Sequence, residues 1–149
     1  MKKFAIATMI ALAASAASAL EVGVTTARDY AGDNRNAVGL TVGQKVGAVT
    51  VTAGFDRATG GTNDQDRYSL VAGVDVAKLG PVSVAVKGGA AYLNNQTGQD
   101  GYAALVGVGV SVPVAKKVAL TLDATRQYGQ SSVNSFDGNR VTAGLKFSF

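Results

Sequence analysis

The sequence predicts an all-β protein: an eight-stranded, antiparallel, up-and-down transmembrane β-barrel. Three observations predict this class. Apolar residues alternate with small or polar residues at a period of two through most of the chain. The alternating segments are roughly 9–12 residues long, about the length that a tilted strand needs to cross a bilayer. Short connections alternate with longer polar ones, as in barrels with tight turns on one side of a membrane and loops on the other.

Residues 1–19 are predicted to be a cleavable signal peptide that takes no part in the fold. Lys2 and Lys3 give a positively charged start, and residues 4–14 are apolar but too short to span a bilayer as a helix. Residues 17–19 read ASA, which is typical of a cleavage site. A buried N-terminal helix is the alternative interpretation. Cleavage would leave residues 20–149 as one domain, the outer-membrane barrel.

Each of the first four predicted strands places its apolar side chains on one face. In the first, Leu20, Val22 and Val24 alternate with Glu21 and Gly23. The opposite faces carry mainly Gly, Thr and Ser with a few charges. These four segments are 20–30, 36–44, 47–57 and 67–77.

The second half of the chain repeats the plan in four more segments. The last of them ends GLKFSF, where Leu145, Phe147 and Phe149 alternate with Lys146 and Ser148. We expect this strand to pair with the first one, which closes the barrel and leaves no free edge. The four segments are 82–92, 102–112, 118–128 and 140–149.

A soluble β-sandwich or lipocalin-like barrel would also show alternation, but it would turn its apolar face inward. An eight-stranded barrel has an interior only just wide enough for side chains, which suits small inward residues and large outward ones. Aromatic residues fall on the apolar face near strand ends, where a membrane barrel carries its interfacial girdles. The predicted girdle is Tyr30, Phe55, Tyr68, Tyr92, Tyr102, Tyr128, Phe147 and Phe149.

With its signal peptide, eight alternating strands and terminal LKFSF, the chain resembles the small outer-membrane β-barrels of Gram-negative bacteria, of the OmpX/Ail-like and OmpA-transmembrane-domain type. The resemblance implies export to the bacterial outer membrane. It also implies a C-terminal signal read by the barrel-assembly machinery, which Val141, Leu145, Phe147 and Phe149 match. The long protruding loops that some of these proteins use for adhesion are not evident in the sequence.

The composition excludes several kinds of chemistry. The chain has no His and no Cys, so it lacks histidine bases, Ser-His triads, thiol nucleophiles and the usual zinc ligands. We therefore expect no enzyme activity, no catalytic or metal site and no cofactor. Removal of Lys2 and Lys3 lowers the net charge from +4 to +2, so the basic balance does not indicate a nucleic-acid partner.

Five charged residues alternate with the outward apolar residues of their segments, so they are predicted to face the lumen. Charges in such a narrow space should be paired, because an unpaired buried charge is costly. We expect Lys87 and Lys146 to meet Asp123, Asp75 or Glu21 and to form a polar plug. The alternative is an ion path, since inward glycines could leave water-filled gaps.

Three arginines are predicted to face the outer leaflet. Arg28 and Arg126 lie two residues from Tyr30 and Tyr128, and Arg57 ends the third predicted segment. A guanidinium group suits phosphate oxygens, so we expect these residues to bind lipopolysaccharide. The alternative is that their side chains only extend to the membrane interface.

Three functions are compatible with these features. The preferred hypothesis is a closed, non-enzymatic barrel, monomeric in the outer membrane, that supports envelope integrity or surface interaction. The second is a narrow channel for ions or small solutes. The third is an adhesin or immune-evasion protein that acts through the loops at 57–66 and 129–139.

Overall fold

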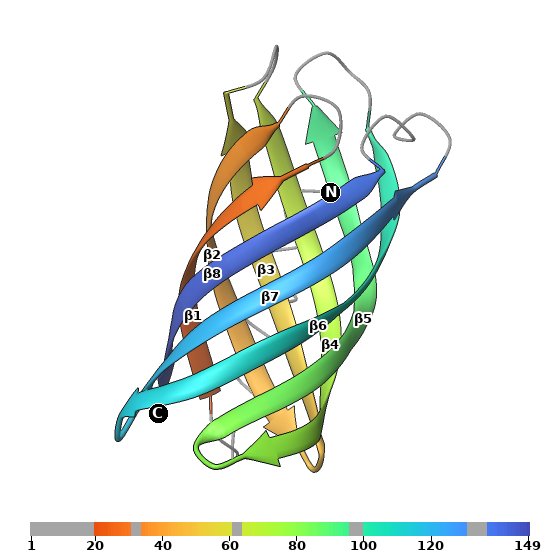
Figure 1. Ribbon diagram of the computed structural model, residues 1–149. Helices are drawn as coiled ribbons and strands as arrows, with labels where there is room; N and C mark the ends of the chain where they lie inside the picture. The colour runs from red at the N-terminus through yellow and green to blue at the C-terminus, as the bar shows by residue number, and fades with distance from the viewer. Residues whose placement is uncertain (1–19, 31–33, 61–63, 96–99, 131–136) are drawn as a thin grey trace.

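The computed structural model describes residues 20–30, 34–60, 64–95, 100–130 and 137–149, so the predicted signal peptide lies outside the described residues. Within them the chain forms eight strands, and each strand pairs antiparallel with its neighbours in sequence (Figure 1). The strands are β1 Leu20–Asp29, β2 Arg35–Val46, β3 Val49–Thr59, β4 Gln65–Leu79, β5 Val82–Asn95, β6 Gly101–Ala115, β7 Val118–Gly129 and β8 Gly138–Ser148.

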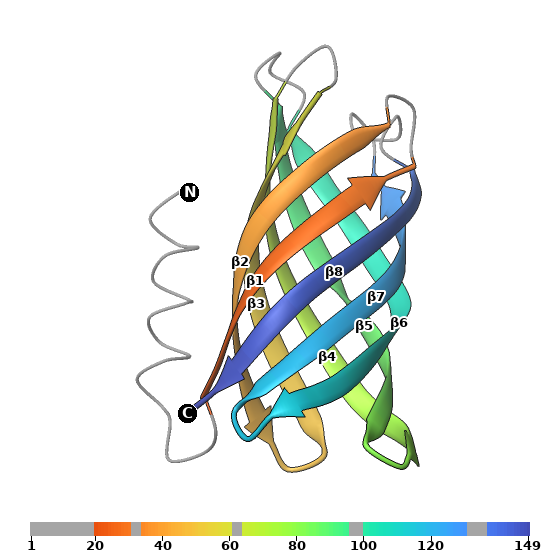
Figure 2. The same cartoon turned by 60° about the vertical axis from the view of Figure 1, so that its left-hand side comes forward.

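The first and last strands pair with each other and close the barrel. Val24 of β1 lies opposite Leu145 of β8, and the Phe149 backbone N–H donates a hydrogen bond of 2.9 Å to the Leu20 carbonyl oxygen. Figure 2 shows β1 and β8 side by side, so the sheet has no free edge. This arrangement confirms the predicted fold class, including the pairing of the C-terminal strand with the first.

The middle strands are longer than the sequence pattern predicted. At the strand ends next to the longer loops, polar residues continue the backbone pairing, with Gln65 of β4 opposite Asn95 of β5. Backbone groups pair whatever the side chain, so loss of apolar alternation did not end these strands. At the other side, irregularities at Asp75/Ala77 and Pro113/Ala115 each insert one residue.

Two ends of the barrel can be distinguished. The turn end carries the start of β1, the end of β8 and three short turns; the loop end carries the four remaining connections. Gly47 and Gly80 begin two of the turns with φ of 62° each, a left-handed conformation in which glycine is strongly preferred. The short connections are therefore all at the turn end, as predicted.

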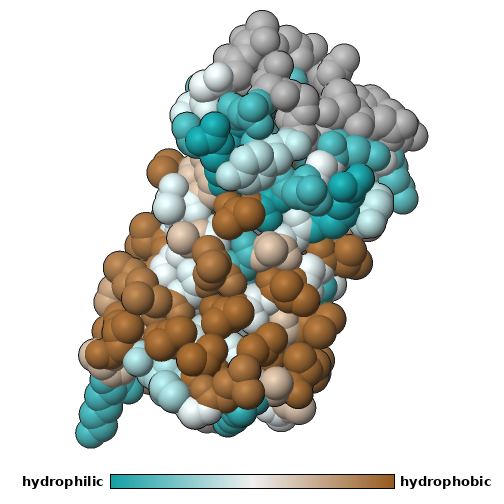
Figure 3. Space-filling view, viewed as in Figure 1, coloured by the Kyte–Doolittle hydropathy of each residue, from teal (hydrophilic) through white to brown (hydrophobic). Residues whose placement is uncertain are grey.

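The outer face of the barrel is apolar over most of its height. Figure 3 shows hydrophobic side chains gathered over the lower part of this face, with hydrophilic ones toward the loop end. Exposed outward residues include Val24, Leu40, Val86, Leu120 and Leu145. This apolar belt is the surface that a bilayer would cover.

Among the described residues there is no helix long and apolar enough to span a membrane.

Candidate functional site in the barrel lumen and on its rim

A buried network of charges fills the lumen toward the loop end. Arg140 of β8 donates to both carboxylate oxygens of Asp29 on β1, at 3.1 and 2.9 Å. A second guanidinium nitrogen of Arg140 lies 2.9 Å from Asp56 on β3. Asp56 also accepts a hydrogen bond of 2.9 Å from Arg67 on β4. We call Asp29, Asp56, Arg67 and Arg140 the arginine network.

The arginine network joins strands on opposite sides of the barrel. Arg140 connects β8 to β3, and Arg67 reaches Gln127 of β7 at 3.5 Å. The Arg140–Asp56 contact is an ion pair by distance, but Asp56 Oδ1 lacks the geometry of a hydrogen bond. All four charged side chains are largely buried, which charges tolerate only when they are paired.

Sequence reasoning missed this network although its signal was present. Parity placed Asp29 and Asp56 on the inner face, but the predicted charge set omitted them. Arg67 and Arg140 stand at the first positions of two predicted segments, where they look like loop residues. Arg67 lies two residues before the inward Ser69 on β4, and Arg140 lies two residues before the inward Thr142 on β8. The alternation of the strands therefore places both arginines on the inner face.

The predicted inner charges lie nearer the turn end and form separate pairs. Lys87 of β5 is in direct contact with Asp123 of β7, and Lys146 of β8 lies 3.0 Å from Glu21 of β1. Asp75 is 3.4 Å from Lys45 instead of meeting Lys87 or Lys146. Lys45 lies just beyond the predicted segment 36–44, but β2 continues through it.

Gly109 provides the space for the pair between Lys87 and Asp123. A Cβ atom built on Gly109 would collide with the Asp123 carboxylate and would lie 2.7 Å from Lys87 Cε. The small residue on β6 therefore lets two side chains from the neighbouring strands meet in front of it.

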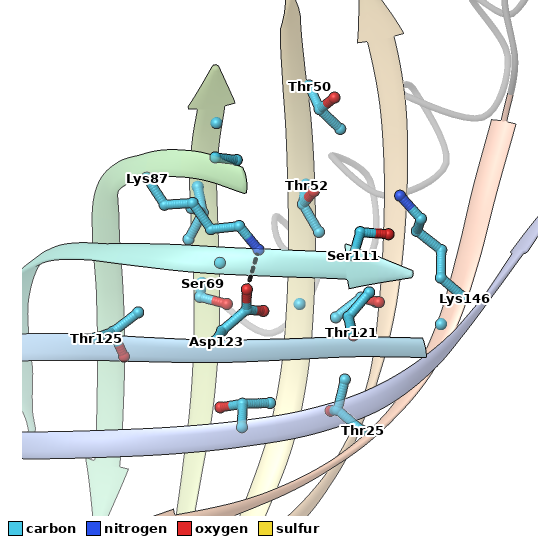
Figure 4. Close-up of a pocket in the computed structure, with 18 of the residues that line it drawn as sticks. Thr25, Thr50, Thr52, Ser69, Lys87, Ser111, Thr121, Asp123, Thr125 and Lys146 are labelled. Carbon is cyan, nitrogen blue, oxygen red and sulfur yellow. Dashed lines mark hydrogen bonds and ion pairs between the residues drawn. The ribbon is translucent and has the colours of Figure 1, made fainter. Parts of the chain in front are cut away.

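A cavity of about 190 Å³ occupies the lumen between the turn end and the arginine network. Figure 4 shows its hydroxyl side chains around the Lys87–Asp123 pair. All eight strands contribute a hydroxyl group to its wall. These residues are Thr25, Thr41, Thr50, Thr52, Ser69, Ser83, Ser111, Thr121, Thr125 and Thr142.

On the outer face, two of the three predicted arginines flank β8 near the loop end. The guanidinium carbon of Arg28 lies 5.7 Å from the Tyr30 ring centre, and that of Arg126 lies 5.6 Å from the Tyr128 ring centre. Arg126 also donates a hydrogen bond of 3.3 Å to Asn139 of β8. Among the described residues, neither guanidinium group forms an ion pair with a carboxylate.

Arg57, the third arginine, is in a different setting. It lies 3.4 Å from Asp64 and 3.8 Å from Asp66, so two acids already neutralise it. Of the predicted phosphate-binding set, the structure therefore brings together only the two members beside β8.

The predicted aromatic girdle forms a row on part of the barrel. Phe55, Tyr68, Tyr92 and Tyr102 are consecutive cross-strand partners on β3 to β6. The rings of Phe55 and Tyr68 are 5.1 Å apart, and those of Tyr92 and Tyr102 are 5.2 Å apart. The exposed rings near the loop end also include Tyr30, directly after β1, and Tyr128, near the end of β7.

The residues of the predicted assembly signal all lie on the outer face at β8. Val141, Leu145, Phe147 and Phe149 are exposed, with Phe149 the most exposed of the four. Leu145 and Phe147 lie opposite Val24 and Val22 of β1. Parts of the two loops considered for adhesion, 61–63 and 131–136, lie outside the described residues.

In the ranges that the structure describes, no group of three or more His, Cys, Asp or Glu could hold a metal ion.

The closed eight-stranded sheet with an apolar outer belt and a polar lumen defines the class of small bacterial outer-membrane β-barrels. More particularly, the chain belongs to the YfaZ family, whose model, described as YfaZ precursor, matches residues 1–142. It is thus an outer-membrane protein, in agreement with the family resemblance and the localisation predicted from the sequence.

Solved structures share this fold at low sequence identity. Neisserial surface protein A is 17% identical, with a TM-score of 0.60 over 88% of this chain and 96% of its own. A major outer membrane protein from Thermus thermophilus is 14% identical, with a TM-score of 0.62 over 87% and 99%. The Yersinia pestis outer membrane protein Ail, in a phospholipid bilayer nanodisc, is 14% identical, with a TM-score of 0.56 over 89% and 99%. A comparison with curated protein sequences gives no match.

Proposed function

We propose that this protein is a non-enzymatic barrel whose lumen is closed to passage, and that it supports the integrity or the surface interactions of the outer membrane. The observation that carries the proposal is the arginine network. Arg140 and Arg67 bridge the lumen in two directions, from β8 to β3 and from β4 to β7. A solute that crossed here would have to separate paired, buried charges, which is costly.

Close packing around the network supports closure. Leu93 and Leu105 are buried on the inner side of β5 and β6, as are Ala27, Ala37 and Ala58 on β1 to β3. These buried side chains narrow the lumen, because an eight-stranded barrel has little room to spare.

The non-enzymatic part of the proposal follows from the chemistry of the lumen. Each charged group that lines its cavity already has an oppositely charged partner in the protein. The sequence offers no His or Cys as an alternative nucleophile or base.

Solute entry into liposomes tests the proposal against a channel. Vesicles that contain the purified protein should not swell in isotonic arabinose faster than protein-free vesicles, whereas vesicles with a general porin should. Swelling of the protein-containing vesicles at a rate that rises with protein content would overturn closure and favour the narrow channel.

We also propose that Arg28 and Arg126 bind lipopolysaccharide phosphates in the outer leaflet. Each guanidinium group lies beside a tyrosine ring on the outer face, near the loop end, and the two lie on the strands that flank β8. Among the residues that the structure describes, neither group is paired with a carboxylate, and a guanidinium group can donate paired hydrogen bonds to phosphate.

The amount of lipopolysaccharide that stays bound to the protein through detergent purification tests this second proposal. The double variant Arg28→Leu, Arg126→Leu should retain several-fold less than the wild type. Arg57→Leu is the matched control, because Asp64 and Asp66 already occupy its guanidinium group, and it should retain as much as the wild type. Unchanged retention in the double variant would refute the site.

A further inference from the structure

The lumen differs in solvent access along its length. Near the turn end, the Asp75 side chain is 36% exposed. At the pair in the middle of the cavity, Lys87 and Asp123 are 27% and 20% exposed. In the arginine network, Asp56 and Arg140 are only 8% and 4% exposed. Asp56 and Arg140 are therefore less accessible than the charges nearer the turn end, and the network forms the inner wall of the cavity.

The cavity wall carries no uncompensated charge. Four acids and four bases line it, and each takes part in an ion pair: Lys87 with Asp123, Lys146 with Glu21, Asp75 with Lys45, and Asp56 with Arg67 and Arg140. An ion entering the cavity would have to compete with these pairs for its partner. The wall thus favours neutral occupants over ions.

The uncharged part of the wall is rich in hydroxyl groups. One row of neighbouring positions runs from Ser83 through Ser111 and Thr121, past Gly144, to Thr25. Each hydroxyl can donate one hydrogen bond and accept others, so the row can satisfy the hydroxyls of a polyol in either direction. Figure 4 shows Ser111, Thr121 and Thr25 in this part of the cavity.

We propose that the lumen is a blind vestibule that opens at the turn end and holds water or a small uncharged polyhydroxyl molecule. The inference rests on the proposed closure of the barrel, because the arginine network supplies the blind end. It adds a solvent-filled binding space on the periplasmic side, where the short turns of an outer-membrane barrel lie. The cavity of about 190 Å³ has room for several waters or for a molecule of the size of glycerol.

Access is tested by one-sided thiol modification, which suits a chain without native cysteine. Thr121→Cys places a thiol in the vestibule, Lys116→Cys marks the turn end, and Thr59→Cys marks the loop end. Each variant is reconstituted into vesicles, and an uncharged, sugar-linked methanethiosulfonate that does not cross the membrane is added outside. The reconstitution must favour one orientation of the barrel in the membrane. Different extents of modification of Lys116→Cys and Thr59→Cys verify this.

The vestibule predicts that Thr121→Cys is modified to the same extent as Lys116→Cys. Modification of Thr121→Cys to the summed extent of Lys116→Cys and Thr59→Cys would show that the thiol is reached from both ends, which overturns both the vestibule and the proposed closure. Absence of modification from either side would overturn the vestibule alone and leave closure intact.

The class of occupant is tested with glycerol as the probe, by NMR of the protein in nanodiscs. Glycerol should shift the backbone amide signals of Thr25, Ser111 and Thr121 in a saturable way, whereas sodium chloride should not. The double variant Thr25→Val, Thr121→Val removes two hydroxyls at nearly constant volume and should reduce the glycerol shifts at Ser111 several-fold. Thr26→Val, on the outer face, is the matched control and should leave them unchanged.

Unsaturable or absent glycerol shifts, or equal shifts in the double variant and the control, would refute the polyol site. Saturable shifts with sodium chloride would replace it with an ion site.

Discussion

At the residue scale, the inner charges differ in how strongly the fold depends on them. Arg140 is buried against two carboxylates, while Arg57 meets its two acids in solvent. Loss of one partner from a buried pair leaves the other uncompensated, whereas exposed pairs contribute little. Arg140→Met should lower the free energy of unfolding by about 3–5 kcal/mol. Arg57→Met should change it by roughly 0–1 kcal/mol. Urea unfolding in lipid vesicles measures both, and equal effects would contradict the assignment of Arg140 to a buried network.

Gly109 gives a second prediction at this scale. Gly109→Ala pushes a methyl group into the Lys87–Asp123 pair and should cost about 1–3 kcal/mol in the same unfolding experiment. Gly88→Ala is the control, since its added methyl group would lie 3.9 Å from the nearest atom, the Leu105 carbonyl oxygen. It should change stability by roughly 0.5 kcal/mol or less. A neutral Gly109→Ala would mean that the pair does not depend on this space.

Inward parity was readable from the sequence, but the choice of partner was not. Alternation put Lys87, Asp123, Lys146 and Glu21 inside, and they pair as two of the expected combinations. Which strands face each other across a closed lumen depends on strand tilt and register, and a period of two contains neither. For this reason the contact from Arg140 to Asp56, between β8 and β3, could not be predicted.

At the scale of the element, β8 has two roles. It closes the barrel against β1, and its outward residues match the assembly signal that the family resemblance implies. The Phe149 side chain is highly exposed, and its backbone N–H donates a hydrogen bond to the Leu20 carbonyl oxygen. Its side chain should therefore matter more for assembly than for the finished fold.

Phe149→Ala should reduce the amount of protein inserted into the outer membrane of cells several-fold, while its urea unfolding midpoint after refolding in vitro stays near that of the wild type. Leu120→Ala, an outward residue on β7, is the control for loss of apolar surface. If Phe149→Ala inserts as well as Leu120→Ala, the terminal ring is not part of an assembly signal.

Element boundaries show why the pattern predicted the strands but not their ends. The apolar alternation stops at the membrane interface, while the backbone ladder continues, as the pairing of Asp66 with Asn94 shows. The sequence pattern reports where side chains meet lipid, and hydrogen bonding decides where a strand ends.

At the scale of the whole molecule, a closed sheet with an apolar outer belt surrounds a lumen that we propose is sealed at one end. The belt and the closure of the sheet were predictable because they follow from the alternation of the eight segments and from the absence of free edges. The seal was predicted only as a general plug of paired charges. Its position toward the loop end depends on Arg67 and Arg140, which the sequence pattern left outside the predicted set.

Single-channel recording across a planar bilayer tests the seal most directly. The wild-type protein, with its folded state verified by faster migration of the unboiled sample in detergent gels, should insert without producing stable conductance steps. A variant with Asp29, Asp56, Arg67 and Arg140 all replaced by Ser, and folded by the same gel criterion, should produce them, because the charged side chains that bridge the lumen have been removed. Stable, reproducible steps from the wild-type protein would contradict the proposed closure.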